Sequence, residues 1–300
     1  MRIRLSVNTG FCATAFPRPE TWVPLVRETL GVDLVQITAD QFAPYMASDL
    51  ARRVANRTRK VADDHGVHIT SAFTGQKTRL SHFCHPVKEV RDFSLAWWCA
   101  FMDVAALCGA KAVGGPVGAM PLPDARDPGK RAAALETAVG YWRRVAEHAA
   151  DAGVETVLWE PMSVAREFGH TLEDLGRVQE TFTDFSVPMR PVLDVDHGDI
   201  SSEDPADTDP YAYLAMYGKI APIVHMKQAL PDKSHHHPFT PEYNAKGVVE
   251  PGKVRDTLEQ AGARDVEWCL ELTFRERTPD EARMLDDLKS SLEYLRPWAE

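Results

Sequence analysis

The sequence predicts an α/β protein folded as a closed (β/α)8 barrel, the TIM barrel. Eight short apolar runs recur along the 300 residues, and amphipathic stretches separate them. No proline-rich or charged linker divides the chain. Strands that alternate with helices form parallel βαβ units, and eight such units close into a barrel of about this length. We therefore expect one domain spanning residues 1–300, with an open doubly wound sheet as the structural alternative.

The predicted strands are short, apolar and bounded by turn residues or by helical patterns. In chain order they are IRLSV (3–7), VDLVQI (32–37), VHITSAF (67–73), AKAVGG (110–115), VETVLWE (154–160), RPVLDV (190–195), APIVHMK (221–227) and VEWCLEL (266–272). Many carry β-branched or aromatic residues, which favour strands.

The clearest helices are predicted at residues 48–66, 85–109 and 127–153, where apolar positions recur with helical spacing. Each of the three segments ends on a glycine, the residue most common just after a helix C-terminus. The glycine-rich stretch at 113–120 has neither GxGxxG nor a GK[ST] ending, so it indicates a close-packed turn and not a nucleotide site.

Composition limits the classes of partner. The net charge of −10 repels phosphodiester backbones, so nucleic acid is not expected. The five cysteines are scattered without CxxC spacing, which indicates neither a disulfide framework nor a zinc cluster. No secretory signal pattern is present at the N-terminus, and no segment reaches the ~20 apolar residues of a membrane span. We expect a cytoplasmic protein that acts on a small molecule.

Four predicted strands end in potential metal ligands, namely Glu160, Asp194, His225 and Glu271. In this fold the active site lies at the C-terminal ends of the strands. Each of these side chains has apolar neighbours in sequence, where an unpaired charge would be costly, and one shared cation would satisfy all four. Three carboxylates and an imidazole favour Mn²⁺, with Mg²⁺, Co²⁺ or Fe²⁺ as alternatives. The competing interpretation is that each residue caps a helix or forms a structural salt bridge.

The order of these residues resembles the xylose-isomerase-like TIM-barrel superfamily, especially its sugar and sugar-phosphate isomerases and ketose 3-epimerases. The most specific element is DVDH, in which Asp194 and His197 match the spacing of a metal-binding aspartate and a substrate-binding histidine. The resemblance implies that Glu160, Asp194, His225 and Glu271 bind the metal. It also implies that the two glutamates exchange protons with opposite faces of a substrate carbon.

Further residues are predicted to contact substrate. The resemblance also implies that Asp194, and not Asp196, is the metal ligand. Lys227 lies two residues past His225, on the same side of an extended strand, and is predicted to hold a substrate hydroxyl or phosphate. Two loops offer weaker candidates, through Lys77 or Arg79 in residues 74–79 and through the histidines at 235–237.

These features predict a metal-dependent sugar or sugar-phosphate epimerase or isomerase that transfers protons through a metal-stabilised enediolate. One alternative is the metal-bearing large subunit of a C-glycoside deglycosidase, which would cleave 3-keto C-glycosides with a small partner subunit. A second is a non-catalytic sugar-binding barrel. Self-association into a homo-oligomer is compatible with the epimerase.

Overall fold

The computed structural model confirms the closed barrel and rules out the open sheet. It describes residues 1–43, 45–79, 82–231, 233–274 and 279–299. The strands follow the order β1-β10-β7-β6-β5-β4-β3-β2 around the barrel, and every neighbouring pair is parallel. The barrel strands are β1 (Arg2–Asn8), β2 (Leu34–Thr38), β3 (His68–Phe73), β4 (Ala112–Pro116), β5 (Thr156–Glu160), β6 (Met189–Asp194), β7 (Ile223–Met226) and β10 (Asp265–Leu270).

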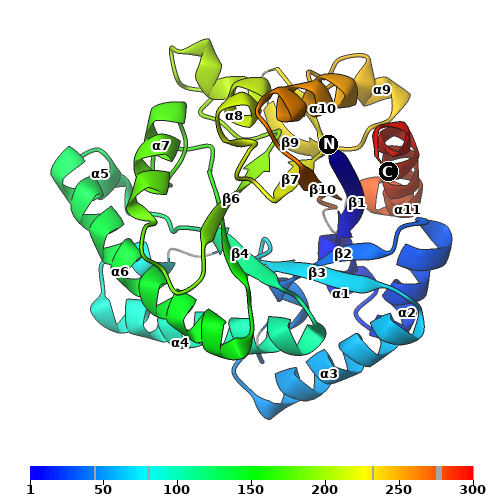
Figure 1. The fold of residues 1–300 in the computed structure, drawn as a ribbon, viewed down its shortest axis with the longest axis horizontal. Helices are drawn as coiled ribbons and strands as arrows, with labels where there is room; N and C mark the ends of the chain where they lie inside the picture. Colours follow the sequence, from blue (N-terminus) through cyan, green and yellow to red (C-terminus); the bar gives the residue numbers. More distant parts are fainter. Residues whose placement is uncertain (44, 80–81, 232, 275–278, 300) are drawn as a thin grey trace.

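Helices surround the strands, as Figure 1 shows. The longer ones are α3 (Asp49–Asp64), α4 (Lys88–Cys108), α6 (Pro128–Ala152), α7 (Leu172–Thr181), α8 (Pro210–Tyr217), α10 (Pro251–Gln260) and α11 (Met284–Leu295). Shorter ones are α1 (Cys12–Ala15), α2 (Pro19–Pro24), α5 (Leu122–Ala125) and α9 (Pro241–Asn244), with single turns at η1 (Thr9–Phe11), η2 (Leu25–Thr29), η3 (Ala39–Gln41), η4 (His82–Cys84), η5 (Pro205–Thr208), η6 (Pro279–Arg283) and η7 (Arg296–Trp298). In the described part of the chain, no helix combines the length and apolar character that crossing a membrane requires.

The three predicted helices are present, although α4 begins at Lys88, three residues after its predicted start. Asp127 caps α6 by accepting hydrogen bonds from the backbone N–H groups of Gly129 and Lys130. Gly109 and Gly153 end α4 and α6 in the left-handed conformation, with φ of 102° and 81°. A side chain is disfavoured in that conformation, which explains the glycines.

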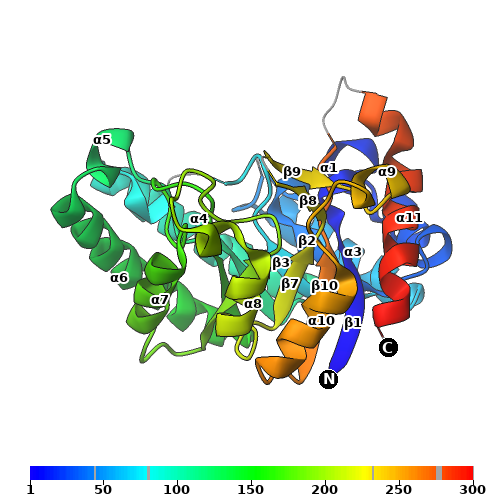
Figure 2. The same ribbon diagram turned by 90° about the horizontal axis from the view of Figure 1, so that it is seen from above.

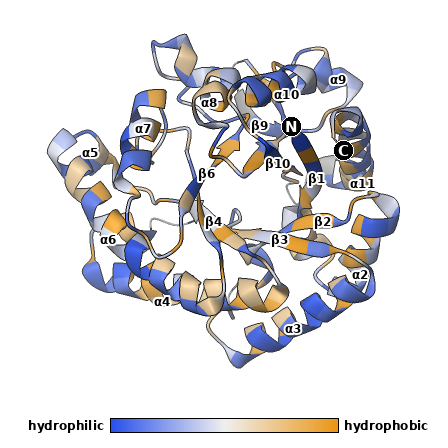
Figure 3. Ribbon diagram, viewed as in Figure 1, coloured by the Kyte–Doolittle hydropathy of each residue, from blue (hydrophilic) through white to orange (hydrophobic). Residues whose placement is uncertain are grey.

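Two hydrophobic clusters hold the fold together. The larger one lies between the strands and the helices, and the outer helices such as α3 carry both hydrophilic and hydrophobic residues in Figure 3. The smaller one consists of side chains from five strands that pack against one another without a helical residue: Phe73, Leu158, Val192, Ile223 and Cys269. It fills the barrel interior, because alternate residues of a strand point to opposite faces.

The chain after β7 forms an antiparallel hairpin of β8 (Gln228–Leu230) and β9 (Lys233–His237), where the sequence indicated an irregular loop. Figure 2 views the barrel from the side, with β8, β9 and α1 at one end and the N-terminus at the other. The barrel draws its strands from residues 2–270, and the single domain over residues 1–300 stays a prediction.

Candidate active site

The predicted ligands form one layer at the C-terminal end of the barrel. Each lies two residues after a member of the interior cluster: Glu160 after Leu158, Asp194 after Val192, His225 after Ile223, and Glu271 after Cys269. Because side chains alternate along a strand, all four point inward, one layer beyond the apolar filling. The parallel register aligns them further, since Asp194 pairs directly with His225.

The structure brings these four side chains into contact distance. One ligand atom from each lies within 4.8 Å of the others. His225 Nδ1 is 2.8 Å from Glu160 Oε1 and 3.5 Å from Glu271 Oε2. Glu160, Asp194 and His225 are buried, whereas Glu271 is partly exposed to a pocket. The sequence argument from strand ends therefore selected residues that meet in space.

Lys227 lies among these carboxylates. Its ammonium is fully buried and donates hydrogen bonds to Asp194 Oδ2 and Glu271 Oε2, both at 2.5 Å. The predicted role of Lys227 in substrate binding stays a prediction. In the structure its positive charge compensates two of the proposed ligands.

The local charges set the ionisation of the cluster. Burial by itself raises the pKa of Asp194, but His197 and Lys227 lower that pKa to about 2. Burial also opposes ionisation of Glu271, yet Lys227 and His225 hold the pKa of this carboxyl well below its usual range. For His225, burial lowers the pKa, while Glu271 and Glu160 outweigh that effect and raise it. Asp194 and Glu271 are therefore carboxylates, the form that binds a cation.

The donor set fits a divalent metal ion. Three carboxylates and one imidazole converge within a few ångströms, and hard divalent cations such as Mn²⁺ and Mg²⁺ prefer oxygen-rich sets of this kind. The ring of Phe73 meets the His225 imidazole edge to face, with centroids 5.1 Å apart and planes at 85°. That contact, together with two hydrogen bonds, restrains the imidazole. The choice of Mn²⁺ stays a prediction.

In the DVDH segment, Asp194 joins the cluster and His197 lies beside it, while the predicted substrate contact of His197 stays a prediction. His197 Nδ1 donates a hydrogen bond to the carbonyl of Pro161 at 2.8 Å, and its Nε2 lies 3.4 Å from Asp194 Oδ2. The backbone N–H of Asp196 donates to Asp194 Oδ1 at 2.8 Å. Asp194, and not Asp196, belongs to the cluster of potential ligands.

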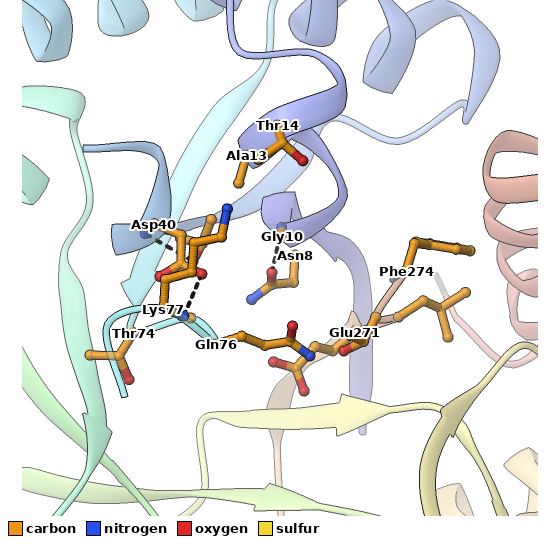
Figure 4. Close-up of a pocket in the computed structure, with 14 residues that line it drawn as sticks. Asn8, Gly10, Ala13, Thr14, Asp40, Thr74, Gln76, Lys77, Glu271 and Phe274 are labelled. Atoms are coloured by element: carbon orange, nitrogen blue, oxygen red, sulfur yellow. Dashed lines mark hydrogen bonds between the residues drawn. The ribbon is translucent and has the colours of Figure 1, made fainter. Parts of the chain in front are cut away.

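A pocket of about 280 Å³ opens beside Glu271. Residues from β1, β2 and the segments after β3 and β10 line it, as Figure 4 shows. Lys77 lines the pocket, and its backbone N–H donates to Asp40 Oδ2 at 3.0 Å. Arg79, the other candidate of that loop, forms a salt bridge with Glu167.

The three histidines at 235–237 differ in their position relative to the cluster. His236 Nδ1 lies 3.3 Å from the carbonyl oxygen of Glu271 and 3.6 Å from Glu271 Oε2. Burial and the nearby Lys227 lower the pKa of His236 to about 4, so the ring is neutral at pH 7. His235 contacts His237, and the ring of His237 stacks on Tyr243. Of the three, His236 is the one placed beside the cluster.

Two polar residues of the site escaped the sequence analysis. Gln36 is fully buried on β2, and its Oε1 lies 2.9 Å from His225 Nε2. Asn8, at the end of β1, donates from Nδ2 to the same Gln36 oxygen at 2.7 Å. The available signal was a lone amide inside the apolar run VDLVQI, since buried polar side chains need partners.

Comparisons with known proteins show the family of the chain. The family model for the xylose isomerase-like TIM barrel matches residues 25–297. The chain is 36% identical over 299 residues to a D-erythrulose 1-phosphate 3-epimerase of Brucella abortus (strain 2308), covering 99% of this chain and 96% of the relative. The expected class of enzyme, an epimerase or isomerase, agrees with that relative.

Solved structures share the fold. A candidate xylose isomerase from Rhodospirillum rubrum superposes with a TM-score of 0.89 at 24% identity, covering 99% of each chain. A D-psicose 3-epimerase from Clostridium cellulolyticum superposes with a TM-score of 0.70 at 14% identity, again covering 99% of each chain. With the family match across most of its length, the chain belongs to the xylose isomerase-like TIM-barrel family.

Proposed function

We propose that the protein is a metal-dependent sugar-phosphate epimerase. The observation that carries this proposal is the position of Glu160 and Glu271. Both carboxylates approach His225 Nδ1 within one cluster of potential metal ligands, and Glu271 also faces a pocket. In this proposal the substrate carbon would bind between the two carboxylates. The curated relative, a D-erythrulose 1-phosphate 3-epimerase, indicates the substrate class.

The two glutamates would move the proton. Epimerisation removes a proton from the carbon beside a carbonyl and returns it on the opposite face. Glu271, whose pKa is held low, is ionised and would accept the proton on one face, and Glu160 would serve the other face. A divalent ion held by Glu160, Asp194, His225 and Glu271 would stabilise the negative charge that develops on the substrate oxygens as the enediolate forms.

Lys227 would balance the charge of the site and contact the substrate. Three carboxylates carry three negative charges, which a divalent cation and the Lys227 ammonium together neutralise when His225 is neutral. Buried charge is tolerated when it is compensated in this way. His197 is fixed by its hydrogen bond to Pro161 and would contact a substrate oxygen next to Asp194.

A small substrate is the better match for the adjacent pocket. Its volume of about 280 Å³ suits a monosaccharide with few carbon atoms, and its lining carries the polar side chains of Asn8, Asp40 and Thr74. No feature of the described residues specifically favours a bulky aromatic aglycone or a separate small subunit. We therefore do not carry the C-glycoside deglycosidase forward as the proposal.

Solvent exchange tests the proposal. Protein loaded with Mn²⁺ is incubated in D₂O with D-erythrulose 1-phosphate, and the products are separated by configuration and weighed by mass spectrometry. We expect deuterium beside the carbonyl together with the epimer. After rigorous chelation the exchange should stop and return when Mn²⁺ is added. Exchange that persists without metal, or metal-loaded protein that is inert toward ketose phosphates, would overturn the proposal.

A further inference from the structure

A chain of hydrogen bonds leads from a backbone amide to the imidazole of His225. It begins at Gly10, whose backbone N–H donates to Asn8 Oδ1 at 2.7 Å, as drawn in Figure 4. A backbone N–H can only donate, so the Asn8 atom that faces it must be the oxygen Oδ1. This contact therefore fixes the orientation of the Asn8 carboxamide. The Nδ2 group of Asn8 must then face Gln36 as a donor.

The orientation of Asn8 in turn fixes the orientation of the Gln36 amide. Its Oε1 lies 2.7 Å from Asn8 Nδ2, so the oxygen accepts from Asn8. The same oxygen lies 2.9 Å from His225 Nε2, and an oxygen of an amide can only accept. His225 Nε2 must therefore carry the hydrogen. When the ring is neutral, the other nitrogen, Nδ1, then holds a lone pair. Without a metal ion Nδ1 can also carry a hydrogen and donate it to Glu160 Oε1, and a metal ion would take the place of that hydrogen.

The direction of that lone pair matters for metal binding. Nδ1 is the ring nitrogen that faces Glu160 Oε1 and Glu271 Oε2, at 2.8 and 3.5 Å. We propose that Asn8 and Gln36 are positioning residues that select the tautomer of His225 competent to ligate a metal ion. A ligating histidine generally donates its second N–H to an oxygen that fixes its tautomer. This inference rests on the proposed metal-dependent function.

The observed orientation of the Gln36 amide leaves its own NH₂ group without a hydrogen bond. Gln36 Nε2 is buried, and no residue in the described part of the chain accepts a hydrogen bond from it. Rotating the amide would place that Nε2 against the donor of Asn8, which is fixed by Gly10. The donor-to-acceptor direction of these hydrogen bonds is thus set by the backbone N–H of Gly10 and is transmitted to His225 through the side chains of Asn8 and Gln36.

Two variants that add the same negative charge distinguish an effect of the His225 tautomer from an effect of charge on metal affinity. Gln36→Glu keeps an oxygen that accepts from both Asn8 and His225. Asn8→Asp keeps the bond from Gly10 but replaces the donor with an acceptor, so Gln36 should rotate and present Nε2 to His225. The imidazole would then carry its hydrogen on Nδ1, toward the metal site.

Metal affinity is the first readout. By calorimetry with Mn²⁺ on the full-length metal-free protein, we expect Gln36→Glu to bind at least as tightly as the wild type. Asn8→Asp should bind about 10- to 100-fold more weakly, the usual cost of losing a residue that orients a ligand. If added negative charge alone governed affinity, both variants would bind more tightly. That result, or an Asn8→Asp affinity equal to wild type, would overturn the inference.

The tautomer itself is the second readout and does not depend on metal. Nitrogen-15 NMR of metal-free protein labelled at histidine, recorded at a pH high enough for the His225 ring to be neutral and with the His225 signals assigned by His225→Gln, distinguishes Nδ1–H from Nε2–H. We expect Nε2–H in the wild type and in Gln36→Glu, and Nδ1–H in Asn8→Asp. Wild type with Nδ1–H would overturn the inference. Wild type with Nε2–H but no metal binding would instead overturn the proposed function.

Circular dichroism and thermal unfolding of each variant control for the fold. Gln36→Met, which has a similar length but no acceptor, adds a variant without new charge. It should lose Mn²⁺ affinity by about 10-fold or more while Gln36→Glu retains it. Equal affinities of the Met and Glu variants would contradict the need for an acceptor at position 36.

Discussion

Two acidic residues four positions apart, Glu267 in β10 and Glu271 directly after that strand, have opposite environments. Glu267 lies toward the N-terminal end of the barrel, is 2% exposed, and accepts hydrogen bonds from Ser6 Oγ at 2.7 Å and Thr70 Oγ1 at 2.9 Å. Burial raises its pKa. Glu271 lies at the C-terminal end, its side chain is 18% exposed, and Lys227 and His225 hold its pKa low. Both side chains point into the barrel, because an even number of positions separates them along the extended chain.

The difference shows what separates a structural acid from a candidate catalytic one. Glu267 accepts hydrogen bonds from two neutral hydroxyl groups and lies 3.8 Å from Arg4 Nη1. Glu271 shares its surroundings with two further carboxylates and borders a pocket. A cluster of buried carboxylates is costly unless cations compensate its negative charge, and such clusters are common at functional sites. The position along the barrel axis therefore decides the role.

The largest expected effect tests this contrast directly. Glu271→Gln removes a proton acceptor and a ligand, so we expect turnover of a ketose phosphate to fall by about 10²–10⁴-fold. Glu267→Gln keeps oxygen for Ser6 and Thr70 and should retain turnover within a few-fold. Steady-state kinetics of both variants at saturating Mn²⁺ checks the comparison, with circular dichroism for the fold. Equal losses in the two variants would mean that the two acids do not differ in role.

A smaller effect is expected at Lys227. Lys227→Met removes a positive charge that lies 2.5 Å from two proposed ligand oxygens, so Mn²⁺ should bind more tightly, by about 10-fold. Turnover should fall at the same time because a substrate contact is lost. Calorimetry and kinetics measure the two effects separately. Lys246→Met, at an exposed lysine paired with Glu242, is the matched control and should change neither. Weaker Mn²⁺ binding in Lys227→Met would show that the ammonium supports the metal.

The smallest effect concerns pH and stability at the other end of the barrel. The raised pKa of Glu267 means that its stabilising contribution is complete below its ordinary value of 4.5 and is lost as pH rises through the folded pKa. Relative to wild type, Glu267→Gln should therefore be more stable at pH 7 than at pH 4. The change is on the order of 1 kcal/mol, the size of one net hydrogen bond. Urea unfolding at both pH values measures it, and an opposite trend would indicate an ionised, charge-paired Glu267.

Much of the fold and part of the site follow from local sequence patterns. The eight strands could be located because a buried strand leaves a short apolar run wherever it lies in the chain. Glu160, Asp194, His225 and Glu271 could be grouped because each ends such a run, and parallel strands of one barrel bring their C-terminal ends together. Lys227 could be placed on the inner face by alternation, but its bonds to Asp194 and Glu271 could not be foreseen.

The tertiary structure decided the contacts between those ends. Gln36 and His225 are 189 positions apart, and their hydrogen bond exists because barrel closure brings β2 and β7 side chains into one interior. Likewise, the hairpin of β8 and β9 places His236, and not its neighbours, beside Glu271. The sequence by itself determined which side chains point inward, since alternation is a property of each strand alone. Which of them meet depends on register and closure, which are properties of the whole barrel.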